Sequence, residues 1–227
     1  MKREYLALKT VAGMLFLFAA MGAALFLSAG TLRYIQGWAY LAAFFVPVAI
    51  ITVYIYRRDK GLLRSRLAAG PVAEARPWQK AIQGMASLAF IAMYIVSALD
   101  WRHGWSGIPP LVSYLCNGGV VAGMWIVGRV FKANSYLSAT IEVQRGQKVI
   151  DSGPYRVVRH PMYSGAALML VCTPPALGSW WGVCAAMALV AVIALRALDE
   201  ERYLAASLPG YADYRRKVRW RLLPGVW

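Results

Sequence analysis

Charged side chains are scarce in this sequence. Only 15% of its 227 residues are Asp, Glu, Lys or Arg, whereas 59% are hydrophobic, and the mean hydropathy is +0.49. Soluble globular domains carry about 25% charged residues, so this composition excludes an ordinary soluble protein. We therefore expect the chain to fold in contact with lipid.

Acidic residues are scarcer still, because 10 Asp and Glu stand against 25 Lys and Arg, for a net charge of +15. When the apolar runs are drawn as membrane spans, 23 basic residues fall on one side and only Arg33 and Arg102 on the other. This positive-inside pattern places both termini and the long loops in the cytoplasm, and we expect the membrane to be a bacterial inner membrane. Since the membrane accounts for the positive charge, nucleic acid is not expected as a partner.

The sequence lacks the residues that several common kinds of functional site require. The three cysteines, Cys116, Cys172 and Cys184, lie in apolar runs without CxxC spacing, and the chain has only two histidines. We therefore expect no metal site and interpret the cysteines as small hydrophobic residues. The sequence has no glycine-rich nucleotide motif, nucleophile elbow or metalloprotease motif. Any chemistry must use the polar residues of the second half.

Long apolar runs are what the sequence has in abundance. A helix needs about 20 apolar residues to cross a hydrocarbon core of ~30 Å. We expect the first run to be kept as a span and not cleaved as a signal peptide, because the residues at its end form a weak cleavage site. Four runs have the required length: Thr10–Ala29, Gly37–Tyr56, Ala81–Leu99 and Leu111–Val130.

A fifth apolar stretch, Met162–Leu198, is long enough for two passes and is interrupted by "TPPALGSWW" at 173–181. The predicted fold is therefore an all-α polytopic membrane protein with five to six transmembrane segments. Its last two segments form a helical hairpin, and its catalytic loops are cytoplasmic. We divide the chain into an N-terminal transmembrane scaffold, 1–110, and a C-terminal membrane-embedded catalytic region, 111–227.

Two features outside the polar half predict local structure. In the basic connector 57–80, Leu62, Leu63 and Leu67 alternate with Lys and Arg at near-helical spacing. This spacing suits a short helix at an anionic membrane surface, and a solvated basic loop is the alternative. Gly119 and Gly123 form a small-xxx-small pair that allows another helix to approach closely.

The segment "DSGPYRVVRHPMYSGAAL" at 151–168 joins a polar loop to an apolar helix. Gly153–Pro154 predicts a turn, and Pro161 suits the first position of a helix, where its missing N–H costs nothing. A helix N-terminus attracts anions, and Arg159 and His160 come directly before it. We expect an anion such as a carboxylate there. The alternative is an arginine that reaches lipid headgroups beside an ordinary polar histidine.

A second polar cluster follows the hairpin, in "LRALDEERYLAASLPGYADYRRKV" at 195–218. Arg196 and Glu200 are one helical turn apart and can pair, whereas Glu201 points about 100° away. One acid is thus left for another partner, unless both belong to a solvated helix end. Five tyrosines near these charges suit either an interfacial aromatic belt or the lining of a cofactor pocket: Tyr155, Tyr163, Tyr203, Tyr211 and Tyr214.

Together, "GPYRVVRHPMYSG" and the later "DEERYL…GYADYRRKV" resemble the isoprenylcysteine carboxyl methyltransferase family and its phospholipid methyltransferase relatives. The resemblance covers roughly residues 115–227. It implies an all-helical membrane methyltransferase that binds S-adenosylmethionine without a Rossmann fold. One departure is Gln147, which stands where the carboxyl methyltransferases carry a histidine. The residues that the resemblance assigns to the cofactor pocket are Gln147, Gly153, Tyr155, Arg159, His160, Pro161, Tyr163, Gly165, Glu200 and Glu201.

The predicted function is methyl transfer to an amphiphilic acceptor, with carboxyl O-methylation of an isoprenylcysteine-like molecule as the first choice. A carboxylate acceptor is ionised at pH 7 and needs only a cation to hold it. We assign catalytic roles to Arg159, Arg196 and Glu201, and Arg219 and Arg221 are further candidates for binding the acceptor. The predicted partners are the bilayer and a lipidic or prenylated acceptor.

Three alternatives remain open. A phospholipid N-methyltransferase would share the motifs but would need a deprotonated amine. A sterol-type NADPH reductase has a C-terminal tail similar to "YADYRRKVRWRLLPGVW". A non-catalytic transporter or assembly factor would use its Arg and Glu residues as structural pairs, although transport usually leaves polar residues near the bilayer midplane.

Overall fold

The computed structural model describes the chain apart from residues 1–2, 68–76, 138–142 and 144–145. Within the described residues the protein is all-helical and contains no strand, which confirms the predicted fold class. The elements are α1 (Arg3–Ala29), α2 (Ile35–Arg58), α3 (Lys60–Leu67), α4 (Pro77–His103), α5 (Pro110–Ala133), the 3₁₀-helix η2 (Gly153–Arg156), α6 (Pro161–Ala176), α7 (Gly182–Ser207) and α8 (Tyr211–Lys217).

Among the described residues, five helices are long and apolar enough to cross a membrane: α1, α2, α4, α5 and α7. The first four contain the four predicted runs, and α6 and α7 divide the fifth apolar stretch into the predicted C-terminal hairpin. The predicted number of five to six segments therefore holds, and the helix that falls short of spanning length is α6, which has only 16 residues. At 1.5 Å per residue it is about 24 Å long, shorter than a hydrocarbon core. It ends early because Pro174 and Pro175 lack the N–H groups that would continue it.

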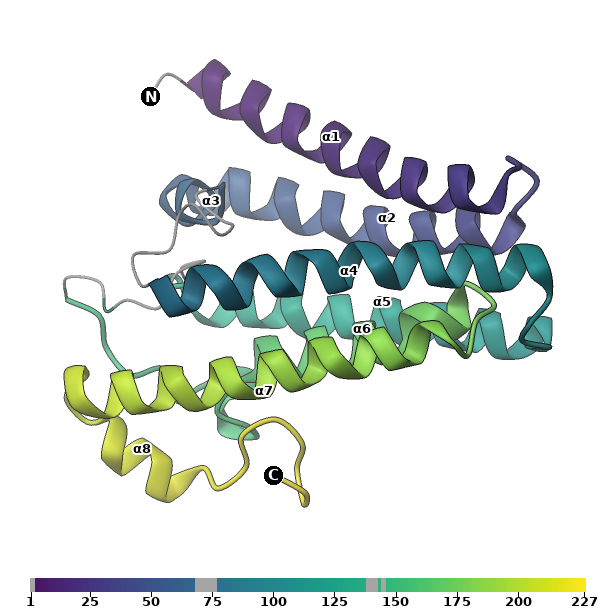
Figure 1. The fold of residues 1–227 in the computed structure, drawn as a ribbon. Coiled ribbons are helices and arrows are strands. Elements are labelled where there is room, and N and C mark those ends of the chain that lie inside the picture. The colour runs from purple at the N-terminus through teal and green to yellow at the C-terminus, as the bar shows by residue number, and fades with distance from the viewer. Residues whose placement is uncertain (1–2, 68–76, 138–142, 144–145) are drawn as a thin grey trace.

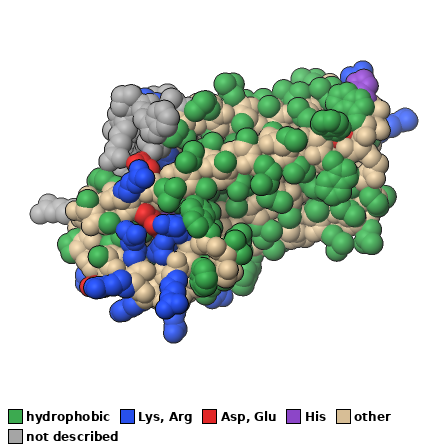
Figure 2. Space-filling view, turned by 60° about the horizontal axis from the view of Figure 1, so that its bottom comes forward, with side chains coloured by type: hydrophobic (Ala, Val, Ile, Leu, Met, Phe, Trp, Pro, Cys, Tyr) green, Lys and Arg blue, Asp and Glu red, His purple; other side chains and the backbone are tan. Residues whose placement is uncertain are grey.

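The long helices and α6 lie side by side between two ends of the molecule (Figure 1). We call the end where α2, α5 and α7 finish and α4 and α6 begin the site end. The far end holds the α1–α2, α4–α5 and α6–α7 turns. Lys and Arg gather at one end, and hydrophobic side chains cover most of the remaining visible face (Figure 2). This distribution is typical of an integral membrane protein.

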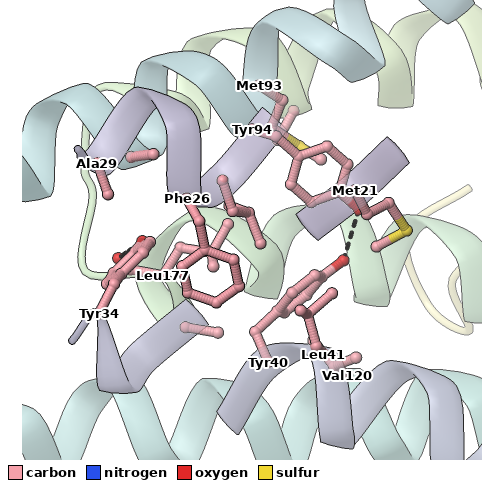
Figure 3. Packing of buried hydrophobic residues seen from close by; sticks show 14 of the residues in the cluster. Met21, Phe26, Ala29, Tyr34, Tyr40, Leu41, Met93, Tyr94, Val120 and Leu177 are labelled. Atoms are coloured by element: carbon pink, nitrogen blue, oxygen red, sulfur yellow. Dashed lines mark hydrogen bonds between the residues drawn. The ribbon is translucent and has the colours of Figure 1, made fainter. Parts of the chain in front are cut away.

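The helices pack around a core that contains two hydrogen-bonded tyrosines. Tyr40 of α2 and Tyr94 of α4 lie in a cluster with Met21, Phe26 and Leu177 (Figure 3). Their hydroxyl oxygens are 2.7 Å apart. Because lipid cannot supply hydrogen bonds, each buried hydroxyl needs a partner within the protein. The tyrosine pair therefore fixes how α2 and α4 face each other.

The closest helix contact joins α5 and α6 through glycine. A Cβ added to Gly123 would lie 2.6 Å from the carbonyl oxygen of Gly165, and one added to Gly165 would lie 2.7 Å from that of Gly123. A Cβ on Gly119 would clash with the Cys172 side chain. The predicted small-xxx-small contact is thus confirmed, and its partner is the motif helix α6. This contact sets the position of the α6 N-terminus.

A buried carboxylate joins the helices by hydrogen bonds at the far end. Helix α4 continues beyond the predicted run, and its Asp100 is fully buried. The carboxylate accepts hydrogen bonds from the Ser106 backbone at 2.7 Å and from the hydroxyls of Ser106 and Ser179 at 2.6 and 2.5 Å. Asp100 therefore ties α4 to the turn between α6 and α7. Nothing in the sequence pattern of residues 1–110, which we assign as scaffold, predicted this role of Asp100.

The connector forms the helix α3, so the solvated-loop alternative is wrong for residues 60–67. Leu62 and Leu63 are buried against Leu6 of α1 and Ile55 of α2. Its leucines thus pack into the protein, whereas a purely surface-bound helix would place them in lipid. The rest of the connector up to α4 lies mostly outside the described residues.

We predict that Gly123→Ala lowers stability by about 1–3 kcal/mol, because the added methyl group overpacks the α5–α6 contact. Thermal unfolding of the detergent-purified protein, followed by tryptophan fluorescence, measures the change. Gly118→Ala is the matched control, since nothing lies within 4 Å of a Cβ at that position. Equal melting temperatures for the two variants would contradict the close contact.

Candidate active site

The loop before α6 determines where this helix begins. Gly153 has a φ of +58°, a conformation that glycine adopts readily, and η2 follows with Pro154 in its first turn. The predicted turn is therefore confirmed. Pro161 is the first residue of α6 and His160 its N-cap, also as predicted.

The C-terminal tail after α8 binds the start of α6. The backbone N–H groups of Arg159 and His160 donate to the carbonyls of Trp220 and Arg221, each at 2.9 Å. The Ser164 hydroxyl donates to a third tail carbonyl at 2.6 Å. The tail thus lies against the backbone at the start of α6, so that its own side chains are close to Arg159 and His160.

Glu201 of α7 is the centre of a buried ion cluster. Its Oε1 atom accepts from Arg159 Nε at 2.6 Å and lies 3.2 Å from His160 Nε2, and its Oε2 atom accepts from Arg221 Nε at 3.1 Å. Arg159 Nη1 also donates to two tail carbonyls at 2.8 Å. Arg159, His160 and Glu201 are only 7%, 6% and 3% exposed. Charges buried this deeply require pairing, and here the partners come from α6, α7 and the tail.

Glu200 points in another direction, as its 100° offset predicts. Its Oε2 atom accepts from the Tyr163 hydroxyl at 2.7 Å, and the same hydroxyl accepts from Arg196 Nε at 3.2 Å. Tyr163 thus links the two residues that helical spacing predicts as a pair. Its ring also stacks on His160, with ring centroids 5.6 Å apart. The two adjacent glutamates therefore serve different networks.

Tyrosines from the loop and from α8 complete this end. The Tyr155 hydroxyl accepts from Asn134 at 2.9 Å, and the Tyr214 hydroxyl donates to the Tyr155 carbonyl at 2.8 Å. Burial raises the pKa of Tyr155 to about 12 and also raises the pKa of Tyr211 and Tyr214. All three hydroxyls therefore stay protonated at neutral pH. The Tyr211 hydroxyl is buried and has no hydrogen-bond partner among the described residues, a state that costs about 1–3 kcal/mol unless a ligand supplies one.

These residues surround a cavity of about 320 Å³. Its size falls within the range of small-molecule sites. Polar groups from both sequence motifs reach it, together with groups from α3, the end of α5 and α8. The polar residues that line it are Arg66, Gln83, Asn134, Tyr136, Gln147, Lys148, Tyr155, Arg159, His160, Tyr163, Arg196, Glu200, Tyr211 and Tyr214.

The cavity brings together most of the predicted site residues, but four of them lie outside its lining. Gly165 packs against α5, and Pro161 starts the helix. Gly153 forms the preceding turn, and Glu201 lies behind Arg159 and His160. Four of the five clustered tyrosines line the cavity, which favours the pocket interpretation over an aromatic belt for them. Tyr203 is not among the lining residues.

Arg66, Gln83 and Asn134 line the cavity without having been singled out by sequence. Arg66 and Gln83 come from the N-terminal half, where no motif is present. Asn134 follows directly after a transmembrane run, a position that carries no signal of its own. Among the described residues, no three His, Cys, Asp or Glu side chains are grouped so that they could hold a metal ion.

Comparison with known proteins agrees with the motifs. Residues 112–209 match the model of the family described as phospholipid methyltransferase. A curated relative, the cobalt-zinc-cadmium resistance protein CzcN of Cupriavidus metallidurans, is 29% identical over 133 residues, which cover 56% of this chain. The match spans 58% of the length of that relative. The predicted resemblance is therefore confirmed: residues 112–209 of this chain are similar to the phospholipid methyltransferase family.

Proposed function

We propose that the protein is an S-adenosylmethionine-dependent methyltransferase that acts at the membrane surface on an amphiphilic acceptor. The reaction we favour is carboxyl O-methylation of an isoprenylcysteine-like molecule. The observation that carries this proposal is a single cavity lined by Arg159, His160 and Tyr163 of one motif and Glu200 of the other. The family match supports methyl transfer in general.

The polar groups of the cavity fit the chemistry of the cofactor. Arg159 and His160 at the start of α6 suit a carboxylate, and Glu200 suits an ammonium group. The unpaired hydroxyl of Tyr211 is a further donor or acceptor for the same ligand. When bound, the cofactor supplies an electrophilic methyl group on a sulfonium. The protein holds and aligns both reactants and keeps water from them.

Glu201 acts in this scheme as a positioning residue. Its carboxylate binds the side chains of Arg159 and His160 and so fixes the two groups that we assign to the cofactor. The assignment explains why an acid that is only 3% exposed belongs to the motif. Glu200, which lines the cavity, is the glutamate that we expect to touch the ligand.

The chemical class of the acceptor depends on whether a group in the cavity is needed to remove a proton from it. Tyr155, Tyr211 and Tyr214 are protonated at neutral pH because burial raises the pKa of each. An amine acceptor would need a base to deprotonate it, whereas a carboxylate is already ionised. We favour O-methylation over phospholipid N-methylation because a carboxylate acceptor needs no base. Arg196, beside Tyr163, is a cation in position to hold the acceptor.

The positive charge of the site end supports a cytoplasmic orientation in a bacterial inner membrane. In that orientation, the cavity faces the compartment that contains S-adenosylmethionine. An acceptor can keep its chain in the bilayer while its headgroup enters the site.

The first experiment is calorimetry of S-adenosylmethionine binding to the detergent-purified protein. We predict that Glu200→Gln weakens binding about ten- to a hundredfold, because an ammonium loses its charged acceptor, worth about 1.5–3 kcal/mol. No binding to the folded wild-type protein would refute the proposed function.

Glu201→Gln provides the contrast between the two glutamates. Loss of its charge leaves the buried Arg159 without its carboxylate, so we predict a loss of about 3–5 kcal/mol in stability, measured by thermal unfolding. Glu200→Gln should unfold close to the wild-type temperature. Comparable destabilisation by both substitutions would contradict the separate roles.

Tyr211→Phe tests the unpaired hydroxyl. We predict unchanged or slightly higher stability, because the substitution removes a buried polar atom without a partner, and about three- to tenfold weaker cofactor binding. Tyr214→Phe is the matched comparison and should lose about 1 kcal/mol of stability, since its hydroxyl bonds Tyr155. Unaltered cofactor affinity in Tyr211→Phe would show that this hydroxyl does not contact the ligand.

A further inference from the structure

Helix α8 and the C-terminal tail, residues 218–227, carry a group of exposed cations that are not among the described residues lining the cavity. These cations are Arg215, Arg216, Lys217 and Arg219. Within residues 211–227 the one acidic residue is Asp213, and it pairs with Arg216. The surface of α8 and the tail is therefore strongly positive and separate from the candidate active site.

The packing of α8 turns these charges outward. Tyr211 and Tyr214 of α8 are buried in a cluster with Val218, and the residues between these three are exposed. A second hollow, which shares only Arg159 with the cavity, is also lined by Ala212, Arg215 and Arg216. Because a planar guanidinium group can bind two phosphate oxygens by parallel hydrogen bonds, this hollow suits a phosphate group.

The lengths of α6 and α7 place the tail at the level of the membrane surface. From the turn at the far end, the 16 residues of α6 extend about 24 Å and the 26 residues of α7 about 39 Å. A hydrocarbon core is about 30 Å thick, so α6 starts near the headgroups and α7 continues into water. Helix α8 leads back from the end of α7, and the tail that follows it bonds the start of α6 (Figure 1). The tail therefore lies near the headgroups.

Apolar side chains of the tail are exposed beside these cations. Trp220, Leu223 and Val226 are 37%, 55% and 75% exposed. A tryptophan among arginines, followed by exposed aliphatic residues, is typical of a segment at a membrane–water interface. There the apolar side chains can face acyl chains while the cations face phosphates. The Lys and Arg side chains at this end lie beside a hydrophobic face (Figure 2).

We propose that the outer surface of α8 and the tail binds the phosphate headgroups of anionic phospholipids. A membrane lipid fits this surface because its cations lie at headgroup level, beside side chains that suit acyl chains. Each Lys or Arg near an anionic membrane surface contributes about fivefold in affinity. The inference does not depend on which reaction the protein catalyses.

A lipid bound here stabilises the start of α6 through the tail. The backbone N–H groups of Arg159 and His160 donate to tail carbonyls, each at 2.9 Å, and Arg221 of the tail binds Glu201. A lipid that binds the docked tail better than a detached tail shifts the equilibrium toward the docked form. Exchange of the Arg159 and His160 amide hydrogens with solvent then slows, because it requires the tail to detach.

The test measures hydrogen exchange by mass spectrometry on the full chain in nanodiscs, without S-adenosylmethionine. One set of discs contains phosphatidylcholine, and the other contains two parts of phosphatidylcholine to one part of phosphatidylglycerol. We expect peptides that cover residues 157–160 and 218–223 to exchange at least about fivefold more slowly in the anionic discs. Peptides from the α4–α5 turn at the far end, residues 104–108, should exchange equally in both.

Two double variants locate the lipid site. Arg215→Gln with Lys217→Gln removes two exposed cations from α8 and should reduce the effect of the anionic lipid to about twofold or less. Arg57→Gln with Arg58→Gln removes the same charge from exposed positions at the end of α2, at the same end of the molecule, and should keep the full effect. Thermal unfolding of each variant shows that it is folded.

Three results would overturn the lipid site. The first is equal exchange of the wild type in the two kinds of disc. The second is an effect that survives in the α8 variant or is lost equally in the α2 variant. The third is equal slowing by inorganic phosphate added to the phosphatidylcholine discs, which would assign the surface to a free anion. Because the cofactor is absent throughout, failure of the proposed function would leave these results unchanged.

Discussion

The geometry of the site end depends on one buried carboxylate, that of Glu201. Its two oxygens contact Arg159 and His160, directly before α6, and Arg221 on the tail, so a single group from α7 joins the start of α6 and the tail to its own helix. Buried ion pairs contribute little net stability, because desolvation offsets their attraction. Their value here is directional, since a cation that left this carboxylate would strand a charge in a poorly hydrated place.

The same hairpin is fixed at its other end by Asp100. Ser179 in the α6–α7 turn bonds this carboxylate, and α6 is pressed against α5 through Gly123 and Gly165 between the two ends. The short length of α6 suits this role. A shift of α6 along α5 would break the hydrogen bonds near both of its termini, to the tail and to Asp100. The motif residues are therefore carried by a helix that is held at both ends and along one side.

Sequence patterns predicted the parts of this arrangement that local physics determines. Apolar run length located the spanning helices, Pro161 marked the start of α6, and helical geometry separated Glu200 from Glu201. What sequence could not give was the direction in which each side chain faces once the helices pack. Nothing local distinguishes Glu200, which lines the cavity, from Glu201, which lies behind it. Arg66 faces the cavity because Leu62 and Leu63 pack against α1 and α2, a contact between distant parts of the chain. The end of α6 at Ala176 falls within the interruption that the sequence shows at 173–181.

The N-terminal half of the chain is more than a scaffold for the catalytic region. The family match begins at residue 112, yet the cavity is completed by Arg66 and Gln83 from before that point. The residues that we assign to the cofactor lie in or next to the matched region, whereas Arg66 and Gln83 extend the same cavity into the N-terminal half. Because no sequence motif marks these two residues, only the folded structure shows that the N-terminal half contributes to the cavity wall.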